Sequence, residues 1–180
     1  LPPRLKYEDD GGPSAAAGLT LLAGSADAET DRMAFQLAQL AFWLMAAPDG
    51  HAKNYSIFLR QSNAYEMTPL YDVLSVWPYI GRSRGQLHWR EVRLAMALRS
   101  KNTHYEIHTI RARHWHDLAM KNGGPLIWEA MQGLVDRIAP ALNEVEAQLP
   151  QDFPERIWEP ISKGMRGQAE KFLSEAATLS

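Results

Sequence analysis

Residues 48–54 read Pro48-Asp49-Gly50-His51-Ala52-Lys53-Asn54, and the predicted fold is arranged around this polar stretch. The run before it, Leu40–Ala47, is apolar throughout. Two short runs with aromatic and β-branched residues follow, Tyr55–Arg60 and Tyr65–Pro69, and Tyr71-Asp72 comes next. Aromatic and β-branched residues favour strands. This order predicts a buried helix, a polar loop, a β-hairpin and a carboxylate that the hairpin brings back beside the loop.

The polar side chains of this loop have two interpretations. Asp-Gly and Asn in a loop usually reflect turn chemistry, and a lone Asp-x₄-Asn spacing often occurs by chance. Here Asp49 and Asn54 share the loop with His51 and Lys53, and Asp72 follows the hairpin. Acids and amides beside an apolar helix cost free energy unless other groups compensate them. We therefore interpret the five residues as a candidate site.

Two segments of the chain resemble the HipA serine/threonine kinases, the toxins of HipBA-type toxin–antitoxin pairs. They are Asp49–Ser56 and Thr68–Ser75. The resemblance continues upstream in Asp10–Pro13 and downstream in Leu94–Leu98 and Leu149–Glu155, so it covers nearly the whole chain. Protein kinases use the same order: a base Asp, an Asn five residues later, two strands and a second metal-binding Asp.

The resemblance implies a mainly α fold: the helical C-terminal lobe of a protein-kinase-like fold, with a small β-hairpin beside the catalytic loop. It also implies transfer of the ATP γ-phosphate to a protein serine, with Mg²⁺ as the second cofactor. Asp49 would be the base that accepts the proton of the substrate hydroxyl. Asn54 and Asp72 would bind the nucleotide through Mg²⁺, an ion that prefers hard oxygen ligands.

His51 and Lys53 are further catalytic candidates. His51 stands two residues after Asp49, where many protein kinases carry a lysine, so it could contact the transferring phosphate. A lone loop histidine more often makes only structural hydrogen bonds, and most lysines are only solvated. The loop lacks the common His-Arg-Asp signature, and Val73-Leu74 stand where most kinases have Phe-Gly. We therefore do not expect an activation-loop switch of the usual kind.

Length and composition fit a single folded domain. The 180 residues are 46% hydrophobic and include six Trp, which is enough for a real core. No apolar run approaches the roughly 18 residues of a membrane span, and no signal peptide is visible. The absence of cysteine excludes disulfides and thiolate metal sites and fits a reducing cytoplasm. A net charge of −2 does not by itself indicate a nucleic-acid partner.

A kinase needs an N-lobe with a glycine-rich loop and a strand lysine. The 47 residues before the loop contain no Gly-x-Gly-x-x-Gly, and Lys6 is their only lysine. We therefore expect residues 1–28 to be an extended lead-in and short helix that link to a missing N-lobe. Residues 29–180 would form the HipA-like helical lobe. On this interpretation the 180-residue chain folds alone but does not catalyse.

Hydrophobic periodicity and helix-ending residues predict the remaining elements. The predictions are a helix over 14–22, a helix over 29–47 capped by Thr30 or Ser25, a short helix over 92–98, a strand over 105–110, a helix over 112–122, a helix over 125–149 with a kink near Pro140, and a last helix capped by Asp152.

The segment Arg82–His116 is strongly basic. It holds eight Lys/Arg and two Asp/Glu, a net of +6, which leaves −8 for the rest of the chain. A solvated basic face is one explanation, and a surface for an acidic partner or DNA phosphates is the other. The solvated face is the commoner explanation, but the HipA resemblance lends support to the second, because these kinases join a DNA-binding antitoxin, HipB, on operator DNA.

The resemblance also suggests a protein substrate such as an aminoacyl-tRNA synthetase, in particular glutamyl-tRNA synthetase. A hypothesis from another class is a non-catalytic binding module that keeps this lobe for complex formation with the antitoxin and operator. The presence of Asp49, Asn54 and Asp72 favours the kinase.

Overall fold

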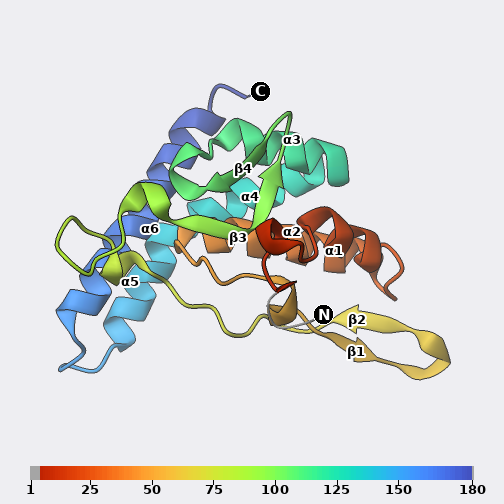
Figure 1. Ribbon diagram of the computed structural model, residues 1–180, viewed down its shortest axis with the longest axis horizontal. Helices are drawn as coiled ribbons and strands as arrows, with labels where there is room; N and C mark the ends of the chain where they lie inside the picture. The colour runs from red at the N-terminus through yellow and green to blue at the C-terminus, as the bar shows by residue number, and fades with distance from the viewer. Residues whose placement is uncertain (1–4, 180) are drawn as a thin grey trace.

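The computed structural model describes residues 5–179, and within them it is mainly helical, as predicted (Figure 1). Its helices and strands, in chain order, are α1 (Ala15–Leu22), α2 (Ala28–Leu44), β1 (Ile57–Leu59), β2 (Tyr65–Met67), β3 (Arg93–Arg99), β4 (Thr103–Glu106), α3 (Ala112–Asn122), α4 (Pro125–Asp136), α5 (Ile138–Gln148) and α6 (Glu155–Ala176).

Helix α2 is the central helix of the fold. Its N-terminal cap is Asp27, which accepts a hydrogen bond from the Thr30 backbone N–H at 3.2 Å, so the predicted caps Thr30 and Ser25 were wrong. Its C-terminal turns are buried on all sides, as the apolar run predicted. Trp43 is 0% exposed, and its indole Nε1 donates to the carbonyl oxygen of Ile107 at 3.0 Å.

Helices α3, α4 and α6 pack around α2 and supply the core (Figure 1). The Trp43 ring lies 6.0 Å from the ring of Trp115 on α3 and 6.4 Å from that of Phe172 on α6. Trp128 on α4 completes the aromatic group, with its ring 5.4 Å from that of Phe172. Aromatic side chains bury large apolar areas, so this group contributes much of the burial that holds the four helices together.

The predicted hairpin is confirmed, although each strand is shorter than expected. Strands β1 and β2 pair antiparallel, with Ile57 opposite Met67 and Leu59 opposite Tyr65. Ser62 and Asn63 in the turn both have φ of 60°, a conformation that Asn in particular tolerates. Figure 1 shows the hairpin projecting from the helical body, where Leu59 is 80% exposed.

The predicted short helix over residues 92–98 was wrong, because this segment is strand β3. It pairs antiparallel with β4, with Leu98 opposite His104. The five residues Leu94–Leu98 are all buried, so the strand has no polar face that alternation would reveal. Such a run cannot be told from a buried helix by periodicity. The predicted strand over 105–110 was wrong in extent: β4 ends at Glu106, and a 3₁₀ turn, Ile107–Thr109, follows.

The predicted long helix over 125–149 is two helices, which confirms the expected interruption near Pro140; the break itself lies at Arg137. Pro140 stands in the first turn of α5, where a missing backbone N–H costs no intrahelical hydrogen bond. The chain therefore accommodates the proline by starting a new helix just before it. The last helix, α6, is confirmed, but Pro154 is its N-cap residue without a side-chain bond, and the expected Asp152 cap was wrong.

The lead-in is not extended where the structure describes it; residues 1–4 lie outside the described part. Residues Glu8–Asp10 form a 3₁₀ turn that packs on β3. The Glu8 carboxylate is buried, accepts the Ala97 backbone N–H at 2.8 Å and pairs with Arg99. Asp9 pairs with Arg93 at 2.9 Å. The boundary near residue 29 stays a prediction.

The segment that follows Asp72 is fastened between α2 and α6 by Trp77. The Trp77 indole Nε1 donates to the Leu44 carbonyl oxygen at 3.1 Å, and its ring stacks on Trp89 at 4.8 Å. On α6 a Cβ added at Gly164 would lie 2.2 Å from a carbon of the Trp77 ring. The absence of a side chain at Gly164 is therefore what lets this segment lie against α6.

We predict that Gly164→Ala lowers the free energy of unfolding by about 1 to 3 kcal/mol, because the added methyl overpacks the Trp77 contact. Gly167→Ala, on the same helix with no heavy atom within 4 Å of the added Cβ, is the matched control. It should raise stability by roughly 0.5 to 1 kcal/mol through helix propensity alone. Urea unfolding of both variants measures this, and equal stability of the two would contradict the packing described.

Candidate functional site

Loop 48–54 begins where α2 stops. Ala46 adopts a left-handed φ of 47°, and the Ala47 backbone N–H donates to the Phe42 carbonyl oxygen at 2.8 Å, which turns the chain away from the helix axis. The loop then folds back on the helix at Gly50. A Cβ at Gly50 would lie 2.5 Å from the Phe42 ring, so only glycine allows this approach. The loop is thus packed directly on the buried helix.

Asp49 and Asn54 are tied together inside the loop. The Asn54 side-chain Nδ2 donates to the Asp49 backbone carbonyl oxygen at 2.7 Å, and Asn54 is 5% exposed. A 3₁₀ turn, Ala52–Asn54, delivers the amide to this position. Because the bond uses the amide nitrogen, the side-chain oxygen of Asn54 accepts no hydrogen bond from any residue among 5–179. The five-residue spacing noted in the sequence therefore corresponds to a direct hydrogen bond.

The Asp49 carboxylate is contacted by a segment that sequence reasoning missed. Its Oδ1 accepts hydrogen bonds from Tyr7 Oη at 2.5 Å and from Lys6 Nζ at 3.2 Å. His51 Nε2 lies 3.5 Å from the same oxygen. Lys6 is the only lysine before the loop, which is one weak signal in the sequence, but no sequence feature marks Tyr7. A separation of 42 residues makes this contact invisible to local patterns.

These neighbours set the charge state of Asp49. Burial raises the pKa of the carboxyl, but the hydrogen bonds from Tyr7 and Lys6 and the nearby His51 outweigh burial and hold the pKa below its usual range. Burial, together with the bond to Asp49, raises the pKa of Tyr7, so its hydroxyl stays protonated and is the donor. Asp49 is thus an ionised carboxylate at neutral pH, as a proton acceptor must be.

His51 and Lys53 differ in placement. His51 is buried beside Asp49, its ring edge-on to Tyr7 with centroids 5.5 Å apart, and its Nδ1 has no hydrogen-bond partner among residues 5–179. The Lys53 side chain is exposed and forms no ion pair within the described chain. His51 therefore lies next to Asp49, whereas Lys53 forms no ion pair with any acidic side chain of the described chain.

The hairpin brings the Tyr71-Asp72 segment back to the loop. Tyr71 Oη lies 2.7 Å from Ser56 Oγ and donates to the Lys53 carbonyl oxygen at 3.0 Å. Asp72 follows at once, with φ of 56°, which is left-handed and marks a locally constrained backbone. Its carboxylate is exposed and makes no hydrogen bond or ion pair with any described residue. Asp72 is therefore free to bind a cation from solution.

The available donors fit Mg²⁺ held together with a nucleotide. Within residues 5–179 no group of three or more His, Cys, Asp or Glu side chains is arranged to hold a metal. Mg²⁺ usually keeps several waters and takes one or two protein carboxylates plus substrate phosphates. The side-chain oxygen of Asn54 and the carboxylate of Asp72 are two oxygen ligands of this kind. Such a site would be completed by phosphates and water rather than by further protein side chains.

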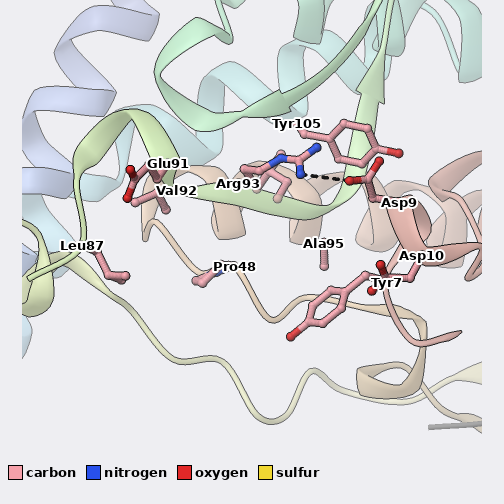
Figure 2. Close-up of a pocket in the computed structure, with 11 residues that line it drawn as sticks. Tyr7, Asp9, Asp10, Pro48, Leu87, Glu91, Val92, Arg93, Ala95 and Tyr105 are labelled. Atoms are coloured by element: carbon pink, nitrogen blue, oxygen red, sulfur yellow. Dashed lines mark hydrogen bonds and ion pairs between the residues drawn. The ribbon is translucent and has the colours of Figure 1, made fainter. Parts of the chain in front are cut away.

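A pocket of about 340 Å³ lies beside the loop (Figure 2). It is lined by Tyr7, Asp9, Asp10, Pro48, Leu87, Glu91, Val92, Arg93, Leu94, Ala95 and Tyr105. Figure 2 shows the Asp9–Arg93 ion pair next to Tyr105, with Tyr7 below them in the view. Tyr7 therefore borders both this pocket and the Asp49 carboxylate.

The basic segment Arg82–His116 is partly neutralised within the chain. Arg93 and Arg99 pair with the acidic lead-in, and Arg111 pairs with Glu175 on α6 at 2.8 Å. Three of the eight cations are thus engaged by acids from distant parts of the sequence. The prediction that this segment binds DNA or an acidic partner stays a prediction.

No helix within residues 5–179 has the length and apolarity that a membrane crossing requires.

Comparisons with known proteins bear on the fold and the family of the chain. The chain is 31% identical over 148 residues to the protein named "Putative kinase Y4mE" of Sinorhizobium fredii; the match covers 81% of this chain and 32% of that protein, so the chain spans about a third of its relative's length. The fold superposes with a TM-score of 0.79 and 23% identity on HipA of Shewanella oneidensis, solved with HipB and operator DNA. That match covers 96% of this chain and 41% of HipA, and it supports the kinase-like helical lobe.

The model of the HipA-like C-terminal domain family matches residues 1–150, five-sixths of the sequence. It includes loop 48–54, the hairpin and Asp72. The chain belongs to the HipA-like C-terminal domain family.

Proposed function

We propose that this chain is the C-terminal catalytic lobe of a serine/threonine protein kinase, which transfers the ATP γ-phosphate to a protein hydroxyl. The observation that carries the proposal is the Asn54 to Asp49 hydrogen bond at 2.7 Å. This bond ties the Asp49 backbone to the Asn54 side chain and leaves the amide oxygen of Asn54 without a hydrogen bond from any residue among 5–179, and the Tyr71 contacts bring the Asp72 segment to the same loop. A proton acceptor next to two oxygen ligands is the arrangement phosphoryl transfer requires.

In this proposal Asp49 accepts the proton of the substrate hydroxyl as that oxygen bonds to the γ-phosphorus and ADP leaves. Asn54 and Asp72 hold Mg²⁺, which when bound neutralises charge on the phosphates. His51, buried beside Asp49, would contact the transferring phosphate. Lys53 is kept as a candidate because an exposed lysine reaches an anionic substrate readily.

The substrate and partners belong to the same proposal. We take the substrate to be a protein, with an aminoacyl-tRNA synthetase, glutamyl-tRNA synthetase above all, as the expectation from the HipA resemblance. A HipB-like antitoxin is the proposed partner, supported by the HipA structure that was solved with HipB and operator DNA. The cysteine-free sequence favours the cytoplasm as compartment.

A second candidate function is a non-catalytic binding module for the antitoxin and operator. It is supported by the same DNA-bound HipA structure and by the cations of Arg82–His116 that form no ion pair with any residue among 5–179, such as Arg82, Arg84 and Arg90. A module of this kind has no use for the free oxygens of Asn54 and Asp72, so we favour the kinase.

Asp49→Asn in the full-length protein should reduce phosphoryl transfer by roughly 10²- to 10⁴-fold, the usual scale for a general base. The amide keeps the shape of the side chain but cannot take up the proton. Asp152→Asn, an exposed carboxylate between α5 and α6, is the matched control and should retain full activity. Transfer of ³²P from labelled ATP measures both, and a wild-type rate for Asp49→Asn would remove Asp49 as the base.

Asp72→Ala should weaken Mg-ATP binding more than Asn54→Ala, because a carboxylate brings a full charge to the ion and an amide only a dipole. Asp72→Asn should also weaken binding, although asparagine suits the left-handed backbone, because the charge is what is lost. Of these three variants, only Asn54→Ala should lower the melting temperature, since it removes the hydrogen bond inside the loop. Calorimetric titration with Mg-ATP gives the order, and the reverse order refutes Asp72 as the main metal ligand.

A further inference from the structure

We propose that Tyr7, together with Lys6, is a positioning residue for the base: it fixes one oxygen of the Asp49 carboxylate so that the other faces the substrate hydroxyl. The inference rests on the proposed function, because it assumes that Asp49 accepts the proton. It adds a residue 42 positions upstream that neither the sequence pattern nor the comparisons assign.

The contacts of Asp49 are asymmetric. Oδ1 receives the Tyr7 hydroxyl at 2.5 Å and the Lys6 ammonium at 3.2 Å, and His51 Nε2 lies 3.5 Å away. Oδ2 accepts no hydrogen bond from any described residue. The carboxylate therefore has one engaged oxygen and one oxygen free to accept a hydrogen bond from a substrate.

Such asymmetry matters because a general base works only within hydrogen-bond reach and in the right direction. An Asp side chain in a loop can rotate about its two torsions, so without other contacts the carboxylate points toward the substrate only part of the time. Two donors on Oδ1 remove that freedom before the substrate binds, which is the advantage of preorganisation. A hydrogen bond to a charged group is also roughly twice as strong as one between neutral groups.

Tyr7 is itself held from the other side, so it can act as a fixed point. The Gly12 backbone N–H donates to the Tyr7 carbonyl oxygen at 2.8 Å, and Gly11 between them has φ of 91°. A Cβ at Gly12 would lie 2.6 Å from that carbonyl oxygen, so the turn requires glycine there. Next to Tyr7, the buried Glu8 is bonded to the Ala97 N–H of β3.

The chain of contacts thus runs from β3 through Glu8 and Tyr7 to Asp49. Asp9 adds a second attachment through its ion pair with Arg93 on the same strand. The lead-in packs on the buried strand β3, and β3 packs on the helical core. This arrangement gives the acidic lead-in a role in the site, beyond the packing of β3.

The test compares Tyr7→Phe with Tyr105→Phe in the full-length protein. Tyr105 lines the same pocket and makes no hydrogen bond to Asp49, so it is the matched loss of a hydroxyl. We expect Tyr7→Phe to lower kcat by roughly tenfold, the scale of a misplaced catalytic group, with KM for ATP nearly unchanged. Tyr105→Phe should leave both parameters unchanged. Melting temperatures of the variants show that each is folded.

A double-mutant cycle separates positioning from a merely structural role. In an Asp49→Asn background Tyr7→Phe should cost almost nothing further in kcat, because the group it positions is gone. Lys6→Met should lower kcat as Tyr7→Phe does. Lys6→Arg, which keeps the positive charge, should retain most of the wild-type kcat. If Tyr7→Phe costs the same tenfold in both backgrounds, Tyr7 acts elsewhere and the inference is wrong.

Two further outcomes also overturn the inference. A Tyr7→Phe variant with wild-type kcat shows that Asp49 needs no positioning, and a raised kcat shows that the hydroxyl blocks the base. In both cases an inactive Asp49→Asn leaves the proposed function intact. Wild-type transfer by Asp49→Asn, in contrast, removes the proposed function itself, so the two failures are distinguishable.

Discussion

The enclosure of the C-terminal turns of α2 is the constraint on which the rest of the structure depends. Trp43 is 0% exposed, and its indole N–H has the Ile107 carbonyl oxygen as acceptor. A buried donor left without an acceptor costs about 1 to 3 kcal/mol, so the turn between β4 and α3 has to lie at this position. The same helix end must be covered by α3, α4 and α6, because its apolar residues face all directions.

With the helix end fixed, loop 48–54 starts from a defined point and direction. Three contacts then shape the site around it: Gly50 packs on Phe42, Asn54 bonds to the Asp49 carbonyl oxygen, and Tyr71 bonds to the Lys53 carbonyl oxygen. Each one links a polar segment to an element that the core holds in place. A rigid apolar core is thus what allows a charged carboxylate and an amide to keep a fixed geometry at its edge.

The parts of the fold that depend on local sequence could be predicted. The central helix, the polar loop, the hairpin and the helix over 112–122 follow from periodicity, breakers and turn residues. β3 could not, because Leu, Ala and Met favour a helix and only burial on both faces makes Leu94–Leu98 a strand. A break near Pro140 could be predicted, but its place at Arg137 could not, because a proline in a first turn leaves its own helix intact.

In the candidate site, too, local features could be predicted from the sequence and contacts between distant segments could not. The spacing of Asp49 and Asn54 is local and could be recognised, and the hairpin made the return of Asp72 predictable. Tyr7 could not be recognised, since its contact with Asp49 exists only after the lead-in has packed on β3. The partial neutralisation of the basic segment could not be recognised for the same reason: its ion pairs are made with Glu8, Asp9 and Glu175, which come from distant parts of the chain.

The central claim is that loop 48–54 and Asp72 together hold a magnesium–nucleotide complex for phosphoryl transfer. The most direct measurement is a crystal structure of the full-length protein with Mg²⁺ and a non-hydrolysable ATP analogue. Our account predicts the Asn54 carbonyl oxygen and the Asp72 carboxylate at about 2.0 to 2.1 Å from an ion that also contacts the phosphates. An ion bound elsewhere, with Asn54 and Asp72 both outside its coordination sphere, would contradict the account.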